Sequence, residues 1–167
     1  MTSNVPTVRQ FAWVSLVPHY IFMGLIIFVY HLLGVSAPFL YGMLTYLIIS
    51  FGLRNLIAKD HQQGLKLVKR QQFETALPLF EKSVDFFSEN NWVDKYRFLT
   101  LLSSSKMSYK EMGLCNIAFC YSQTSNGQKA IEYYEQTLKE FPENGLAMAG
   151  LKMLNSMGQT AKVGNEN

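Results

Sequence analysis

The first acidic residue of this chain is Asp60, and two long apolar runs, residues 11–34 and 38–57, fill most of the sequence before it. As helices with a rise of about 1.5 Å per residue, both runs are long enough to cross a hydrocarbon core of about 30 Å. No charged residue interrupts either run before Arg54. Because the break between them is short, we expect two antiparallel transmembrane helices, a hairpin.

A cleaved signal peptide is one alternative for residues 11–34. Residues 35–37, Val-Ser-Ala, resemble a cleavage site, but the apolar stretch exceeds the roughly 7–15 residues of a signal core, and Arg9 is the only basic residue ahead of it. A second alternative, an apolar helix pair buried in a soluble fold, would need far more protein around it than the remaining chain supplies. We therefore favour the membrane hairpin.

Basic residues predict the orientation of this hairpin. The loop between the runs has no basic residue. One basic residue, Arg9, precedes the first run, and the others lie at the end of the second run or soon after it: Arg54, Lys59, Lys66, Lys69 and Arg70. By the positive-inside rule, both termini face the cytoplasm, residues 1–10 included. We expect an integral, multi-pass protein, in a bacterial inner membrane rather than in an organelle membrane.

The charge after the hairpin is balanced. Of the 15 basic residues, Arg9, Arg54 and Lys59 precede Asp60, which leaves twelve against the 12 acidic residues. A neutral domain gives no electrostatic reason to expect nucleic acid as a partner.

Residues suited to catalysis or metal binding do not form a recognisable motif. His19 and His31 are about 18 Å apart along a helix, too far to bind one haem iron. Cys115 and Cys120 point in different directions on a helix, which argues against a disulfide. His61 has no acidic neighbour in the sequence except Asp60. The sequence therefore predicts no enzyme activity, no cofactor and no metal.

A spacing of small and aromatic residues occurs twice after Asp60. Its members follow one another at equal intervals in the two copies: Gly64, Ala76 and Phe80, then Ala118, Ala130 and Tyr134. Small residues let two helices approach closely, and an aromatic ring one turn later fills the space beside them. The spacing therefore indicates a repeated pair of packed helices.

This pattern resembles the tetratricopeptide repeat, a helix–turn–helix of about 34 residues. One unit would be residues 57–90, with its first helix continuing directly from the second membrane run, and the other 111–144. The second unit carries most of the signature: Leu114, Ile117, Ala118, Tyr121, Ala130, Tyr134 and Pro142. The first departs from it at Asp60 and Gln63. The resemblance implies an all-α domain over residues 58–157, with a capping helix at 145–157 and a disordered tail at 158–167.

Residues 91–110 are an insertion between the two units. Trp92, Tyr96, Leu99 and Leu102 recur at helical spacing, and three serines at 103–105 then end the pattern. We expect a short extra helix that supplies apolar burial to a domain with fewer than three repeats, and then a long helix from about residue 107 to 123.

The resemblance also implies a concave groove, lined by the first helix of each unit, that binds a partner's peptide or helix. The candidate contact residues there are His61, Leu65, Val68, Met112, Cys115, Phe119 and Ser122. Trp92 and Tyr96 of the insertion join them, because these residue types often anchor interfaces. For each of these side chains, a place in the hydrophobic core is the alternative.

We therefore predict a membrane-anchored adaptor or scaffold, in which a cytoplasmic tetratricopeptide-like domain recruits or assembles a protein partner. The alternative is an accessory subunit of a membrane transport or secretion complex, with the hairpin as the main contact through Gly24, Gly42 or Gly52. A second copy of this chain also stays open as a partner.

Overall fold

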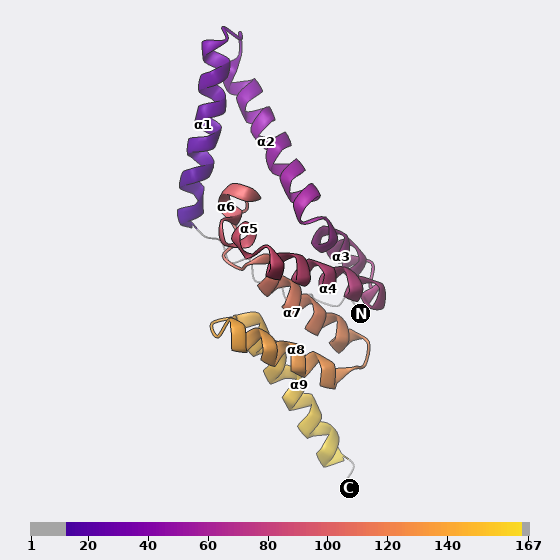
Figure 1. Ribbon diagram of the computed structural model, residues 1–167. Helices are drawn as coiled ribbons and strands as arrows, with labels where there is room; N and C mark the ends of the chain where they lie inside the picture. The colour runs from indigo at the N-terminus through magenta and orange to yellow at the C-terminus, as the bar shows by residue number, and fades with distance from the viewer. Residues whose placement is uncertain (1–12, 165–167) are drawn as a thin grey trace. The chain divides into compact units, whose positions relative to one another are not determined.

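The computed structural model describes residues 13–164, and these residues contain helices and no strand (Figure 1). The all-α prediction is confirmed; the predicted segment 1–10 lies outside the described residues. The elements in chain order are η1 (Trp13–Ser15), α1 (Leu16–Leu32), α2 (Pro38–Ile57), α3 (Lys59–Lys69), α4 (Phe73–Glu89), α5 (Asn91–Lys95), α6 (Arg97–Thr100), α7 (Tyr109–Gln123), α8 (Gly127–Glu140) and α9 (Gly145–Gly164).

Contacts divide the described residues into two compact units. The apolar-helix unit contains residues 13–59 and Glu89–Ser108, that is, η1, α1, α2, α5 and α6. The core unit contains Asp60–Ser88 and the described residues from 109 onward, with α3, α4, α7, α8 and α9.

Helices α1 and α2 carry the apolar runs. α2 is long and apolar enough to cross a membrane, and α1, with 17 residues, is apolar but shorter. α1 ends because Gly34 adopts the left-handed conformation, with φ +68°. α2 begins with Pro38 in its first turn, where a missing backbone N–H costs no hydrogen bond. Large apolar side chains along both helices are exposed; Leu56, for example, is 78% exposed.

The two helices contact each other through a small residue and a polar pair. Gly42 is buried, and a Cβ atom at this position would collide with Ile27 of α1. Nearby, the hydroxyl groups of Tyr30 and Thr45 are 2.9 Å apart and form a hydrogen bond. Gly42 therefore serves the contact between α1 and α2 rather than an open surface.

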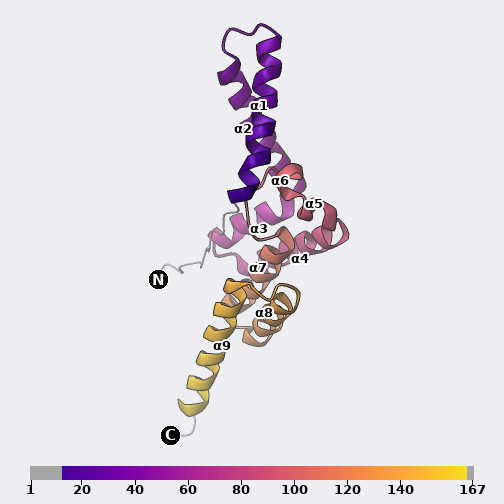
Figure 2. The same ribbon diagram turned by 90° about the vertical axis from the view of Figure 1, so that its left-hand side faces the viewer.

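The insertion packs differently from the expectation that it would complete the repeat domain. It forms two short helices, α5 and α6, and both belong to the apolar-helix unit. Figures 1 and 2 show α6 beside the ends of α1 and α2 that are distant from their connecting turn. Hydrogen bonds account for this position: the Phe98 carbonyl group of α6 accepts from His19 of α1, and the carbonyl groups of Leu101 and Leu102, directly after α6, accept from Arg54 of α2.

The core unit buries one face of each of its helices. Its central cluster consists of Val68, Ala76, Phe80, Ile117 and Cys120, all less than 6% exposed. Each of these residues occupies the inward position that the helical period predicts. The repeated spacing in the sequence thus reports a packed interior.

Glycines set close approaches between helices of the core unit. A Cβ atom at Gly64 of α3 would lie 2.8 Å from the Phe80 ring of α4. Likewise, a Cβ atom at Gly113 of α7 would lie 2.6 Å from Val84 of α4. On α9, a Cβ atom at Gly150 would meet the ring of Tyr134. Without a side chain at these three positions, the helix backbones come near enough for the facing side chains to fill the space between them.

Three helix ends differ from the sequence analysis. α2 and α3 are not continuous, because the helix breaks at Ala58, whose φ and ψ are −96° and 33°. α7 begins at Tyr109, two positions after the expected start near residue 107. α9 continues to Gly164, past the expected end at residue 157, because no proline or other strong helix breaker follows.

The contact at Gly64 makes a testable prediction. We expect Gly64→Ala to lower the free energy of unfolding by about 1 kcal/mol, because overpacking of about 2 kcal/mol outweighs a helix-propensity gain of about 1 kcal/mol. Denaturant unfolding of the detergent-solubilised full chain measures the change. Gly127→Ala is the matched control, because nothing lies within 4 Å of a Cβ atom there. If Gly64→Ala is as costly in a Phe80→Leu background as in the parent chain, the assigned contact is wrong.

Candidate protein-binding site

The structure buries three of the residues predicted to line a groove. His61, Val68 and Cys115 are 2%, 5% and 6% exposed. Their side chains therefore contribute to the interior of the core unit, and in this conformation a partner cannot reach them.

His61 lies in a closed aromatic cage. The rings of Phe80 and Tyr109 meet the imidazole edge-on, with centroids 5.5 and 5.2 Å away. A hydrogen bond of 3.4 Å joins Nδ1 to the Ser83 hydroxyl group. Burial in these surroundings lowers the pKa of His61 from 6.5 to about 4, so the imidazole is neutral at physiological pH. It is a packed polar residue rather than an available acid or base.

The other predicted groove residues are half-buried. Leu65 and Phe119 pack against the central cluster, and the Phe119 ring meets Phe73 edge-on at 5.8 Å. Met112 and Ser122 are also half-buried, and the Ser122 hydroxyl group donates to the Phe119 carbonyl group of its own helix. Little apolar surface therefore remains open along the predicted groove.

Trp92 and Tyr96 are exposed but belong to the other unit. They are 63% and 45% exposed, and Leu99, one turn later, is 54% exposed. All three lie on the insertion in the apolar-helix unit. The structure therefore divides the nine predicted contact residues between two units instead of joining them in one site.

A groove that the sequence analysis did not predict lies between α8 and α9. It has a volume of about 490 Å³ and is lined by Leu138, Met148, Leu151, Lys152, Asn155 and Ser156. Its surface is mainly apolar, with an amine, an amide and a hydroxyl group at its side. Two apolar residues on the predicted capping helix, Met148 and Leu151, are the signal for it in the sequence. We call this feature the α8–α9 groove.

Asn144 holds the start of α9, which forms one wall of this groove. Its side-chain oxygen accepts a hydrogen bond of 2.7 Å from the Ala147 backbone N–H, as an N-cap does. Its amide group donates to the Glu111 carboxylate of α7 at 2.8 Å. Asn144 is 3% exposed, so this link is shielded from water. The sequence offers the N-cap signal, an asparagine directly before a helix, but not the bond to Glu111.

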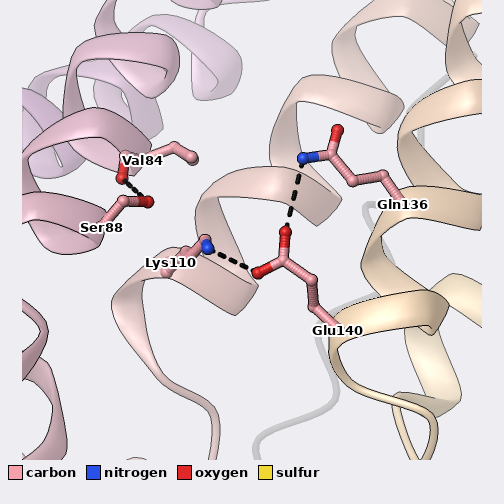
Figure 3. Close-up of polar contacts among 5 residues, drawn as sticks. All are labelled: Val84, Ser88, Lys110, Gln136 and Glu140. Atoms are coloured by element: carbon pink, nitrogen blue, oxygen red, sulfur yellow. Dashed lines mark hydrogen bonds and ion pairs between the residues drawn. The ribbon is translucent and has the colours of Figure 1, made fainter.

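A surface contact joins the ends of α7 and α8. Figure 3 shows the Lys110 amine next to the Glu140 carboxylate, which also accepts a 3.5 Å hydrogen bond from Gln136. Because Lys110 and Glu140 are both partly exposed, such a pair contributes at most about 1 kcal/mol.

Within residues 13–164, the structure shows no group of three or more His, Cys, Asp or Glu side chains that could hold a metal ion. Burial raises the pKa of both Cys115 and Cys120 to about 12, so neither is a ready thiolate nucleophile. An apolar groove with a few polar groups at its edge is the usual form of a ligand-binding surface.

Comparisons with protein-family models, curated proteins and solved structures find no match to this chain.

The cage around His61 predicts an acid-sensitive fold. Because its pKa is about 4 when folded and 6.5 when unfolded, the unfolded chain binds the extra proton first as pH falls. We expect stability from this group to be complete above pH 6.5 and to fall between pH 6.5 and 4. The loss is at most about 3 kcal/mol, at about 1.4 kcal/mol per pH unit.

His61→Leu should remove this part of the pH dependence, measured as unfolding free energy across the same pH range. His31→Gln, at an exposed histidine of α1, is the control and should retain it. Identical pH profiles for the parent chain and His61→Leu would contradict the assignment.

Proposed function

We propose that this protein is a membrane-anchored adaptor, with α1 and α2 both crossing the bilayer. The carrying observation is the exposure of large apolar side chains along both helices, while the core unit closes around its own interior. A bilayer is the surrounding in which such surfaces are stable. α1 together with η1 is about 32 Å long from helix rise, which is sufficient despite the 17 residues of α1.

The distribution of basic residues supports one orientation of α1 and α2 in the membrane. Arg54 lies near the end of α2, and Lys59 follows the break at Ala58. The turn at residues 33–37 carries no basic residue. In the proposed topology, both termini and the core unit are cytoplasmic, and the turn faces the opposite side.

We further propose that the core unit is a small tetratricopeptide-like domain. Two helix pairs, α3 with α4 and α7 with α8, would form the units, and α9 would be the cap. Support comes from the resemblance of the signature residues and from the close approaches at Gly64, Gly113 and Gly150. The α8–α9 groove is the binding surface that fits best, because the surface of the first helices is largely occupied by core packing.

The proposed partner presents a short apolar helix or peptide to this groove. A volume of about 490 Å³ accommodates only a few side chains. Met148 and Leu151 would contact the apolar side chains, and Lys152 and Asn155 would make polar contacts at the edge. Methionine is well suited to such a role, because its flexible side chain adapts to partners of different shape.

Cysteine labelling tests the topology. The native thiols of Cys115 and Cys120 are buried, with pKa values raised to about 12, so they should react slowly in the folded chain. In sealed, right-side-out vesicles, an impermeant maleimide should label Ser36→Cys but not Glu143→Cys; inverted vesicles should give the opposite result. The parent chain measures the background. Labelling of both positions from the same side would exclude two crossings.

Photocrosslinking in native membranes tests the groove. A photoreactive residue at Asn155 should capture a protein, and Met148→Asp should reduce the yield about tenfold by placing a charge on an apolar contact. Met153→Asp is the matched control, because Met153 is 53% exposed and does not line the groove.

Crosslinks from Leu47 of α2 but none from Asn155 would instead favour the alternative, an accessory subunit whose main contact is the pair of apolar helices. The open surface at Gly24 and Gly52 supports this alternative, because a Cβ atom at either position would have no neighbour within 4 Å. A helix of another subunit could approach closely there.

A further inference from the structure

The segment Glu89–Ser108, which we call the wedge, exposes large apolar and aromatic side chains between two helices of the core unit. It contains α5, α6 and a non-helical stretch up to residue 108, and it belongs to the apolar-helix unit. We propose that the wedge enters the cytoplasmic leaflet of the bilayer beside α1 and α2, with Trp92, Tyr96 and Leu99 against lipid. This inference rests on the proposed function, because it requires α1 and α2 to cross the membrane.

Hydrogen bonds fix the depth of the wedge along these two helices. His19 Nε2 donates to the Phe98 carbonyl group at 3.0 Å. Arg54 donates to the carbonyl groups of Leu101 and Leu102, at 3.3 and 2.6 Å. From helix rise, His19 lies about 20 Å from the end of α1 at the turn, and Arg54 about 24 Å from the corresponding end of α2. In a core of about 30 Å, these contacts lie about 6–10 Å inside its cytoplasmic boundary.

The backbone of the wedge is prepared for surroundings without water. Side chains donate hydrogen bonds to many of its backbone carbonyl groups, whereas in a loop exposed to water such groups commonly bond to water. Besides the bonds from His19 and Arg54, Arg97 donates to the carbonyl groups of Asp94, Ser105 and Lys106, at 2.9, 3.0 and 2.6 Å. Thr100 donates to that of Val93 at 2.7 Å. Irregular backbone at membrane depth needs such internal partners, since each unsatisfied group there costs several kcal/mol.

Arg54 has the surroundings expected of a cation near the edge of a hydrocarbon core. Its guanidinium group also donates to the Ser50 hydroxyl group at 3.0 Å, so it bonds to three oxygen atoms. Two of them are the backbone carbonyl groups of Leu101 and Leu102, directly after α6. Charged residues within membrane segments are commonly paired with backbone carbonyl groups in this way.

Three exposed side chains of the wedge are of residue types that favour lipid. Trp92, Tyr96 and Leu99 follow one another at helical intervals and are 63%, 45% and 54% exposed. Tryptophan and tyrosine favour the region between headgroups and acyl chains. The Lys95 amine lies 5.7 Å from the centre of the Tyr96 ring, and Lys106 is exposed. The wedge therefore has cationic side chains that can pair with the phosphate groups of lipid headgroups.

Fluorescence quenching by lipid tests the proposal in the full chain. Trp13 and Trp92 are the two tryptophans, so Trp13→Phe leaves Trp92 as the single emitter. The protein is reconstituted in phosphatidylcholine vesicles with or without bromine on the acyl chains near the headgroup. We expect bromine to reduce Trp92 emission by about twofold or more, as for a side chain at the boundary of the hydrocarbon core.

A reference variant separates this proposal from the proposed function. It carries Trp13→Phe, Trp92→Phe and Phe51→Trp, which puts the single tryptophan on the exposed face of α2. Quenching at position 51 but not at Trp92 would overturn the wedge and leave the membrane anchor intact. No quenching at either position would overturn the membrane anchor itself.

A second pair of variants tests the positioning role of Arg54. In the Trp13→Phe background, Arg54→Met should reduce the quenching of Trp92 about threefold or more, because the bonds to Leu101 and Leu102 are lost. Lys59→Met removes the same charge from an exposed position and should leave the quenching unchanged. Equal quenching in the parent and Arg54→Met, or equal losses in both variants, would show that the carbonyl bonds of Arg54 do not hold the wedge.

Discussion

The bonds from Arg54 to the carbonyl groups of Leu101 and Leu102 connect parts of the chain that are 47 and 48 residues apart. They place a segment that interrupts the core unit in the other unit. Within residues 13–164, the chain therefore passes between the two units after Lys59, after Ser88 and after Ser108. Deletion of this insertion would also affect α2, because the guanidinium group of Arg54 would lose two of its three hydrogen-bond acceptors. The segment is thus part of the structure around the apolar helices, whatever surrounds them.

Much of the helical arrangement could be predicted, because helix period and small-residue spacing follow directly from close packing. Ala76, Phe80, Ala118 and Ala130 are fully buried, as their repeated spacing indicated. The place of the insertion could not be predicted in the same way. A period in Trp92, Tyr96 and Leu99 shows that one face is apolar, but it does not show whether that face meets a core, a partner or lipid. The unit to which the insertion belongs depends on hydrogen bonds between residues distant in sequence, and a pattern along the chain contains no information about them.

The candidate site shows a second limit of the same kind. In an extended helical array, the first helix of each pair divides its residues between the packed interior and an open concave surface. Only two pairs precede α9 here, and the aromatic side chains of Phe80 and Tyr109 close around His61. The sequence pattern determines the place of His61 on its helix, whereas the exposure of its side chain depends on how many neighbouring helices pack against that helix. The α8–α9 groove was missed for the complementary reason: its lining consists of isolated apolar residues on a helix end, and nothing along the chain joins Leu138 to Met148.

The small size of the α8–α9 groove fits a membrane adaptor better than a free binding protein. A surface that holds only a few side chains provides limited binding energy once the loss of translational and rotational freedom is counted. In the proposed function, two transmembrane helices confine the groove to a thin layer beside the membrane, where a partner in the same membrane is present at high effective concentration. Weak contacts are then sufficient for association and still allow rapid release. A wedge in the cytoplasmic leaflet would add to this confinement, because it gives α1 and α2 a third attachment and limits how far they can shift along the membrane normal.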